Sequence, residues 1–125
     1  MTDEISNPAF TTGRSVVTVS SDVVDGVVVL SVHDVVDAAT ASQLRSAIDE
    51  VIDDGPAGLV IDLSAVTFLA SAGMTALMKA KERAGDIGFA VVANSPATSR
   101  PLKVLGLDSE LTVCATVDEA VSRLA

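Results

Sequence analysis

Basic residues and aromatic rings are scarce in this chain of 125 residues. Eight Lys and Arg face seventeen Asp and Glu, which gives a formal net charge of -9, and there are three Phe but no Trp or Tyr. Proteins that bind nucleic acid usually present a basic face, and binders of single strands stack bases on aromatic rings. The composition therefore argues against a DNA or RNA partner and against an anionic membrane surface. A protein partner with a basic patch suits the charge, because complementary fields speed encounter.

Cysteine and long apolar runs are also scarce. Cys114 is the only cysteine, so no internal disulfide can form, which is compatible with a reducing cytosol. Its apolar neighbours predict an inert, buried thiol in a strand. The longest weakly polar stretch, 66–78, is too short to cross a bilayer, which needs about 20 residues. The N-terminus has no basic start and no apolar run, unlike a signal peptide. We expect a cytoplasmic protein without membrane contact.

Residue sets for catalysis are missing as well. His33 is the only histidine, and nothing in the spacing places it beside a serine and an acid. No group of Cys, His or carboxylates has metal-ligand spacing, and no Gly-rich phosphate-binding motif follows a strand. Asp62 ends a predicted strand, as the phosphate-accepting aspartate of a receiver domain does, but the acidic pair that holds magnesium there is absent. We interpret Asp62 as an acceptor for backbone N–H groups of a loop. The expectation is no enzyme, no cofactor and no metal.

Hydrophobic periodicity predicts alternating strands and helices after a polar tail at residues 1–14. β-Branched runs predict the strands, and apolar residues three and four apart predict the helices. The predicted strands are 16–19, 27–32, 59–63, 89–93 and 111–114, and the first three predicted helices are 38–53, 71–84 and 99–105. A fourth helix is predicted to run to 124, because Thr116 and Glu119 have the spacing of a capping box at its start. Pro101 is expected in the first turn of its helix, and Gly106 at its end.

Turn and cap residues support this order. Asp25-Gly26 is a turn signal, so the first two strands are predicted to form a hairpin. Either Asp37 or Thr40 is placed to cap the first helix. Strands that alternate with helices imply a mostly parallel sheet. The sequence therefore predicts one α/β domain over 15–125, with a mixed sheet, an N-terminal hairpin and about four helices.

The most informative stretch runs from Asp62 to Met74. A strand ends, a short connection follows, and Ser71-Ala72-Gly73 opens a helix. In the plain structural interpretation, Ser71 caps that helix. Ala70 and Ala72 flank the hydroxyl with methyl groups, so it can be reached, and Gly73 lowers helix propensity but permits close approach by another surface. A small, smooth, hydroxyl-bearing spot suits docking better than catalysis.

This stretch resembles the signature of STAS domains, whose founding members are bacterial anti-sigma-factor antagonists. In that family, a strand ending in Asp or Asn is followed by an apolar turn that ends in Asp-Ser-x-Gly-Leu. Two further pieces resemble the family in order: 35–40 with Leu44, similar to its Leu-Asp-x-x-Thr segment, and 95–97 with 105–107, similar to its third-helix region. The resemblance covers about residues 15 to 125 and implies a STAS-like fold.

The resemblance also implies partner switching in stress-responsive bacterial transcription. The unphosphorylated protein binds an anti-sigma factor, itself a serine kinase of the histidine-kinase-like ATPase type, and so frees a sigma factor. The kinase phosphorylates the serine, here Ser71, the complex falls apart, and a phosphatase resets it. By the same resemblance, Ser71, Asp37 and Gly73 lie at the contact surface, with Asp62 in support.

Two positions depart from the family pattern. Ala70 stands where the family has an acidic residue, and Asp34 where it usually has glycine after the second strand. A kinase that needs the missing carboxylate to orient the hydroxyl would phosphorylate Ser71 slowly or not at all. The alternative is therefore a STAS-like binding subunit of a transport or stress-signalling complex that is never phosphorylated. An enzyme on an α/β scaffold is a further alternative, which the absence of a nucleophile-base set disfavours.

Overall fold

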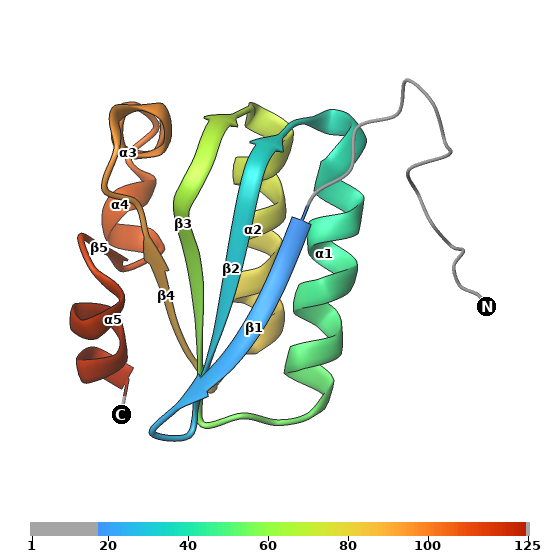
Figure 1. Cartoon of the computed structure of the whole chain (residues 1–125), viewed down its shortest axis with the longest axis vertical. Coiled ribbons are helices and arrows are strands. Elements are labelled where there is room, and N and C mark those ends of the chain that lie inside the picture. Colours follow the sequence, from blue (N-terminus) through green and yellow to red (C-terminus); the bar gives the residue numbers. More distant parts are fainter. Residues whose placement is uncertain (1–17, 125) are drawn as a thin grey trace.

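A computed structural model describes residues 18–124, so the predicted tail at 1–14 and the start of the first predicted strand lie outside the described residues. Strands and helices alternate along the chain after an initial pair of strands (Figure 1). In chain order the elements are β1 (Thr18–Val24), β2 (Val27–Val36), α1 (Ala38–Asp53), β3 (Gly58–Leu69), α2 (Ser71–Ala84), β4 (Gly88–Val92), α3 (Pro96–Val104), α4 (Leu107–Glu110), β5 (Val113–Cys114) and α5 (Val117–Leu124).

The described strands form one sheet in the order β1-β2-β3-β4-β5, with β1 antiparallel to β2 and the other neighbours parallel. This confirms the predicted mixed sheet with its N-terminal hairpin. The hairpin turn has two residues, Asp25 and Gly26, with φ of 54° and 81°. Positive φ at both positions is the type I′ geometry, whose twist matches that of the flanking strands.

Helices cover both faces of the sheet. In Figure 1, α1 and α2 lie behind it, and the larger core is between them and the strands, with fully buried side chains that include Leu44, Ile48, Leu59, Ile61, Leu63 and Leu77. On the other face, α5 packs on a smaller cluster that includes Val27, Val60, Val92 and Val121. The middle strands are therefore buried on both faces, which explains their continuous apolar runs.

Strand β3 is longer than predicted. The segment after residue 63, expected to be a connection, continues as strand to Leu69 and pairs with β2, which also runs past its predicted end, to Val36. Register shifts between Ser31 and His33 and between Asp34 and Val35 keep the two strands paired, and Asp34 takes a left-handed φ of 69°. The prediction ended the strand at residue 63, because polar residues around Ser64 interrupt the apolar run. The bulges that keep the strand paired beyond that point depend on the neighbouring strand and cannot be read from the β3 sequence alone.

Helix α3 and the segment after it also correct the prediction. The helix begins at Pro96, the favoured first position for proline, so Pro101 lies in its interior and not in its first turn. Gly106, with φ of 71°, follows the end of α3 as predicted, and the four-residue α4 then begins. A helix of one turn has no readable periodicity, which is why the sequence showed four helices and not five. Only Val113–Cys114 of the last predicted strand is paired.

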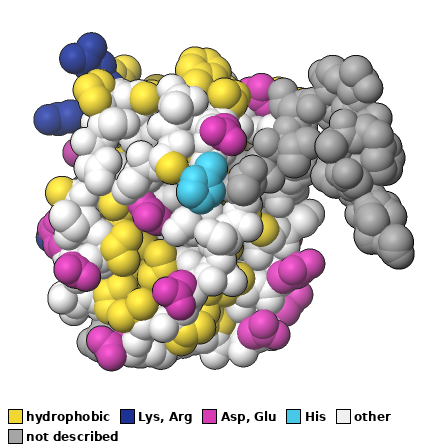
Figure 2. Space-filling view, viewed as in Figure 1, with side chains coloured by type: hydrophobic (Ala, Val, Ile, Leu, Met, Phe, Trp, Pro, Cys, Tyr) yellow, Lys and Arg dark blue, Asp and Glu magenta, His cyan; other side chains and the backbone are white. Residues whose placement is uncertain are grey.

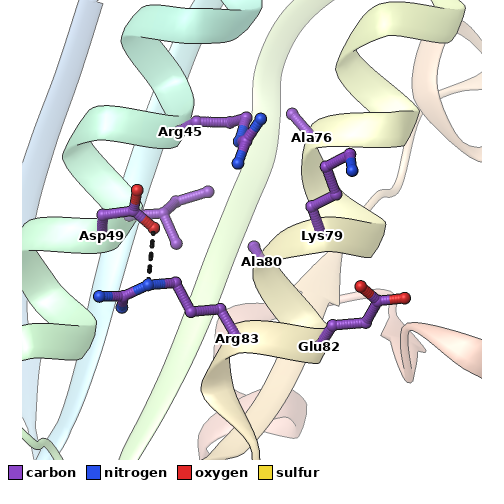
Figure 3. A pocket seen from close by; sticks show the side chains of 8 residues that line it. Arg45, Asp49, Ala76, Lys79, Ala80, Glu82 and Arg83 are labelled. Atoms are coloured by element: carbon purple, nitrogen blue, oxygen red, sulfur yellow. Dashed lines mark ion pairs between the residues drawn. The ribbon is translucent and has the colours of Figure 1, made fainter.

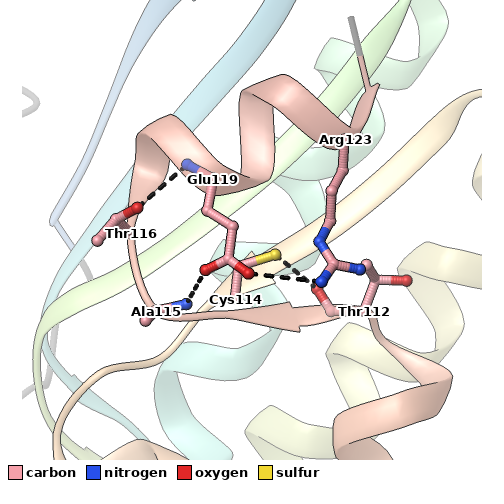
Figure 4. Close-up of polar contacts among 6 residues, drawn as sticks. All are labelled: Thr112, Cys114, Ala115, Thr116, Glu119 and Arg123. Atoms are coloured by element: carbon pink, nitrogen blue, oxygen red, sulfur yellow. Dashed lines mark hydrogen bonds and ion pairs between the residues drawn. The ribbon is translucent and has the colours of Figure 1, made fainter.

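The start of α5 partly matches the predicted capping box (Figure 4). The Glu119 N–H donates to Thr116 Oγ1 at 3.1 Å, but the Glu119 carboxylate accepts from the Ala115 N–H at 3.0 Å, one residue before the expected donor. Arg123 pairs with Glu119 across one turn, at 3.4 Å. Nearby, Cys114 is 2% exposed, and burial raises the pKa of its thiol, which keeps it protonated and unreactive.

None of the helices within residues 18–124 combines the length and the apolar character that a bilayer crossing requires. No three His, Cys, Asp or Glu side chains in this part of the chain gather in a way that could hold a metal ion.

Candidate functional site

Ser71 is the first residue of α2, separated by one residue from the end of β3 at the carboxyl edge of the sheet, and it is exposed. The expectation that Ser71 caps the helix is wrong: the cap position is Ala70, with extended backbone (φ -82°, ψ 168°) and no side-chain hydrogen bond. Within the described residues, the Ser71 hydroxyl has no hydrogen-bond partner. The hydroxyl is therefore available to a partner or a modifying enzyme.

Asp37 caps α1, and Thr40 completes the cap. Asp37 Oδ1 accepts from the N–H groups of Ala39 and Thr40 at 3.0 and 3.1 Å, while Thr40 Oγ1 accepts from the Asp37 N–H at 2.9 Å. The two residues that the sequence offered as alternatives thus act together as a capping box. The second carboxylate oxygen of Asp37, Oδ2, accepts no hydrogen bond from residues 18–124 and remains available.

The sheet brings the starts of α1 and α2 together. The Ala70 N–H donates to the Val36 carbonyl at 2.8 Å, so the residue before Ser71 is bonded to the residue before Asp37. Both helices begin at the same edge of the sheet, at the top of Figure 1. Ser71 and Asp37, which are far apart in sequence, therefore share one small region of the surface.

Gly73 lies beneath this region and not on it. The residue is buried, and a Cβ added to it would stand 2.6 Å from Val36 Cγ1 and 2.8 Å from Leu69 Cδ1. The close neighbours that Gly73 permits are thus residues of β2 and β3. This corrects the expectation that Gly73 lies at the contact surface and lets the surface of another protein approach. Its absent side chain seats the first turn of α2 on the sheet and so fixes where Ser71 points.

Asp62 lies apart from Ser71, because it stands seven residues before the end of β3, a length of about 23 Å in a strand. Its Oδ1 accepts from the Ser64 N–H at 3.0 Å and from the Ser64 hydroxyl at 2.6 Å. Asn94 Nδ2 then donates to Ser64 Oγ at 3.2 Å and to the Ala115 carbonyl at 3.1 Å. Asp62 is confirmed as an acceptor of a backbone N–H, but within a strand, where it helps to tie β3 to the segments after β4 and β5.

A groove beside Ser71 was not foreseen. It has a volume of about 310 Å³, and it runs between α2 and the α3–α4 connection, lined by Ser71, Met74, Thr75, Met78, Lys79, Glu82, Leu105 and Leu107. Leu105 is 57% exposed, Val104 beside it 77%, and Phe68, at the end of β3, 54%. Met74 and Met78 at helical spacing were the available signal, but such a pair more often faces a core.

The comparison with known protein families decides the assignment, because the STAS domain matches residues 18–120. The chain belongs to the STAS domain family. It is 42% identical over 99 residues to the anti-sigma-F factor antagonist RsfB of Mycobacterium tuberculosis. The aligned residues make up 78% of this chain and 81% of that protein. STAS proteins of this kind are regulatory binding proteins and not enzymes.

Solved structures agree with the family. An anti-sigma factor antagonist from Mycobacterium paratuberculosis has a TM-score of 0.83 and 43% identity, over 86% of this chain and 93% of that one. The phosphorylated form of SpoIIAA, a cell fate determinant of Bacillus, has a TM-score of 0.65 at 18% identity, over 86% of this chain and 100% of that one, and supports the fold alone.

Proposed function

We propose that this STAS protein is an anti-sigma factor antagonist whose binding surface surrounds Ser71. In its unphosphorylated form it binds an anti-sigma serine kinase in the cytoplasm and thereby releases a sigma factor. Phosphorylation of Ser71 ends the complex, and a phosphatase restores it. The observation that carries the proposal is the exposed Ser71 hydroxyl, which has no hydrogen-bond partner within residues 18–124 and lies on the first turn of α2.

The free protein tolerates a phosphate at this place. Ser71 has no hydrogen bond to lose, and the unpaired N–H groups of a helix N-terminus stabilise nearby negative charge. A phosphate adds about -1.5 to -2 charges, which a tight interface admits only with desolvation and repulsion. The modification therefore acts on the complex and leaves the fold intact.

The surroundings of Ser71 suit a protein partner. Phe68, Leu105 and the methionine-lined groove offer apolar contact, and methionine adapts to the shape of what it meets. Asp37, whose neighbour Val36 is hydrogen-bonded to Ala70, has a carboxylate oxygen that accepts no hydrogen bond from residues 18–124, and we expect it to serve the partner where Ala70 lacks a carboxylate. Acidic side chains are spread over the face seen in Figure 2, while the basic ones gather at one corner, so the partner we expect presents a basic patch.

Calorimetric titration with the cognate anti-sigma factor tests the proposal. Wild type and Ser71→Ala are expected to bind equally, and Ser71→Glu about 1–3 kcal/mol more weakly, since a carboxylate is buried without a partner. Ser122→Glu, an exposed serine of α5 outside the proposed surface, is the matched control for added charge and is expected to leave affinity unchanged. Equal affinity of wild type and Ser71→Glu would contradict the switch.

Ala70 favours one alternative, a STAS binding subunit of a transport or stress-signalling complex that is never phosphorylated. The chain has no carboxylate at the position before Ser71, where the family pattern has one. Under this alternative, the Ser71 region still contacts a partner, but incubation with kinase and ATP leaves Ser71 unmodified.

A further inference from the structure

A second hollow, which shares Lys79 and Glu82 with the groove beside Ser71, lies between α1 and α2. This α1–α2 cleft has a volume of about 300 Å³ and is lined by Arg45, Ile48, Asp49, Ala76, Lys79, Ala80, Glu82 and Arg83 (Figure 3). Ile48, Ala76 and Ala80 form its floor and are buried, so the apolar surface that a ligand can reach comes largely from the aliphatic stems of the long side chains around them. Two alanines one turn apart on α2 leave the space that longer side chains would fill.

The charges of the cleft are unusual for this chain. Three of its eight basic residues line one hollow, although the net charge is -9. Arg83 is neutralised from α1, with Nε 3.5 Å from Asp49 Oδ1 and Nη2 2.6 Å from Asp53 Oδ1. The hydrogen bond to Asp53 raises the pKa of the Arg83 guanidinium above its ordinary value. Arg83 is thus committed to holding α1 and α2 together.

Arg45 and Lys79 have no such partners. Across residues 18–124, neither side chain makes an ion pair or a hydrogen bond. In Figure 3, Arg45 reaches from α1 toward Ala76 on α2, Lys79 stands on α2 at the same end of the cleft, and Glu82 extends away from it. Two unpaired cations therefore border the buried methyl groups of Ala76 and Ala80.

We propose that the α1–α2 cleft binds a small organic anion, a carboxylate or phosphate monoester with an apolar body, whose anionic group contacts Arg45 and Lys79. A guanidinium recognises such groups through paired N–H donors, and an ammonium adds a point charge. Ala80 at the floor of the cleft and the aliphatic stems of Arg45, Lys79 and Arg83 around it contact the apolar body. Because the net charge of the protein repels anions at long range, binding depends on these local contacts. The site does not rest on the proposed function.

Titration of the isotope-labelled full chain, followed by the chemical shifts of its amides, tests the site. The probes are phenyl phosphate, benzoate and inorganic phosphate, each at constant ionic strength. Saturable shifts are expected at the amides of Arg45, Ile48, Ala76 and Ala80, with a Kd of about 1 mM or below for at least one ring-bearing probe. Inorganic phosphate is expected to bind at least about threefold more weakly, since it leaves the apolar part of the cleft unfilled. Which ring-bearing probe binds more tightly distinguishes a phosphate from a carboxylate ligand.

Variants locate the binding. Arg45→Gln and Lys79→Gln are each expected to weaken it at least about fivefold, as for the loss of a charge-assisted hydrogen bond. The control is Arg100→Gln, which removes an exposed cation of α3 and is expected to leave affinity unchanged; thermal unfolding checks that every variant folds. Unsaturable shifts for all three probes, shifts spread equally over all basic residues, or unaltered affinity in both cleft variants would overturn the proposal.

Discussion

Asp62 and Ser71 belong to one length of chain, Asp62 within β3 and Ser71 two residues past its last residue, yet their side chains have opposite surroundings. The carboxylate of Asp62 binds Ser64, and Asn94 continues the chain of bonds to the Ala115 carbonyl. The hydroxyl of Ser71 is exposed and meets no acceptor or donor within the described residues. A polar residue satisfied inside the molecule holds the fold together, while one left unsatisfied at the surface can serve a partner. Asp37 combines both situations, with one oxygen in a cap and the other unused.

The largest expected effect concerns the packing under Ser71. Gly73→Val places a Cβ within 2.6 Å of Val36 and adds two methyl groups in a buried position. We expect about 3 kcal/mol of lost unfolding free energy in urea titration, because overpacking a filled core forces neighbours to shift. Thr75→Val, an exposed change to the same residue in the same helix, is the control and is expected to change stability little. A stable Gly73→Val would mean that Ser71 is not seated as described.

The two carboxylate oxygens of Asp37 can be tested separately, one as a helix cap and the other as a contact for the partner. Asp37→Ala removes the acceptor of two N–H groups at the start of α1 and is expected to cost about 1–2 kcal/mol in thermal or urea unfolding. Asp37→Asn keeps the cap and loses the charge, so it is expected to be nearly as stable as wild type. Weaker anti-sigma binding by Asp37→Asn than by wild type would assign the free oxygen to the partner; if both variants lose stability equally, the capping account fails.

The network of Asp62 is expected to matter for stability and not for binding. Asp62→Ala should cost about 1 kcal/mol, the net scale of an ordinary intramolecular hydrogen bond. Asn94→Ala should cost less, and the double variant should cost less than the sum of the two, since the residues share Ser64. Additive losses, or an anti-sigma affinity that falls in folded Asp62→Ala, would break the contrast with Ser71.

The smallest expected effect is that of Ser71→Ala on stability. Because Ala70, and not Ser71, occupies the cap position, the change is expected to stay within about 0.5 kcal/mol of wild type. A loss near 1 kcal/mol in urea unfolding would instead indicate a capping serine.

Much of the fold could be predicted because local patterns agree with it. Asp25-Gly26 favours the positive φ angles of the observed hairpin turn, so this turn could be predicted. Helices α1 and α2 have the predicted bounds, because their apolar residues recur at helical spacing and glycines and a proline follow their ends. Strand β3 could not be followed past residue 63, because its last residues pair through bulges that β2 imposes. Pro101 misled the placement of α3, since proline inside a helix is rare but tolerated in a short one.

The site was predictable in position but not in detail. The sequence showed a serine at the start of a helix. It did not show that Ala70 is the cap residue and Ser71 the first helical residue, because helix ends are uncertain by one or two residues. The same sequence could not show that Gly73 faces Val36 and Leu69, nor that Met74 and Met78 open a groove with Leu105. Each of these depends on how α2 is rotated against the sheet.

The most direct test of the central claim is the mass of the protein after incubation with its cognate anti-sigma factor and ATP. Wild type is expected to gain one phosphate, mapped to Ser71, and the purified phosphoprotein to have lost its affinity for the anti-sigma factor. Ser71→Ala is expected to gain none while still binding. No phosphate on wild type, or a phosphoprotein that binds as tightly as the unmodified form, would contradict the account.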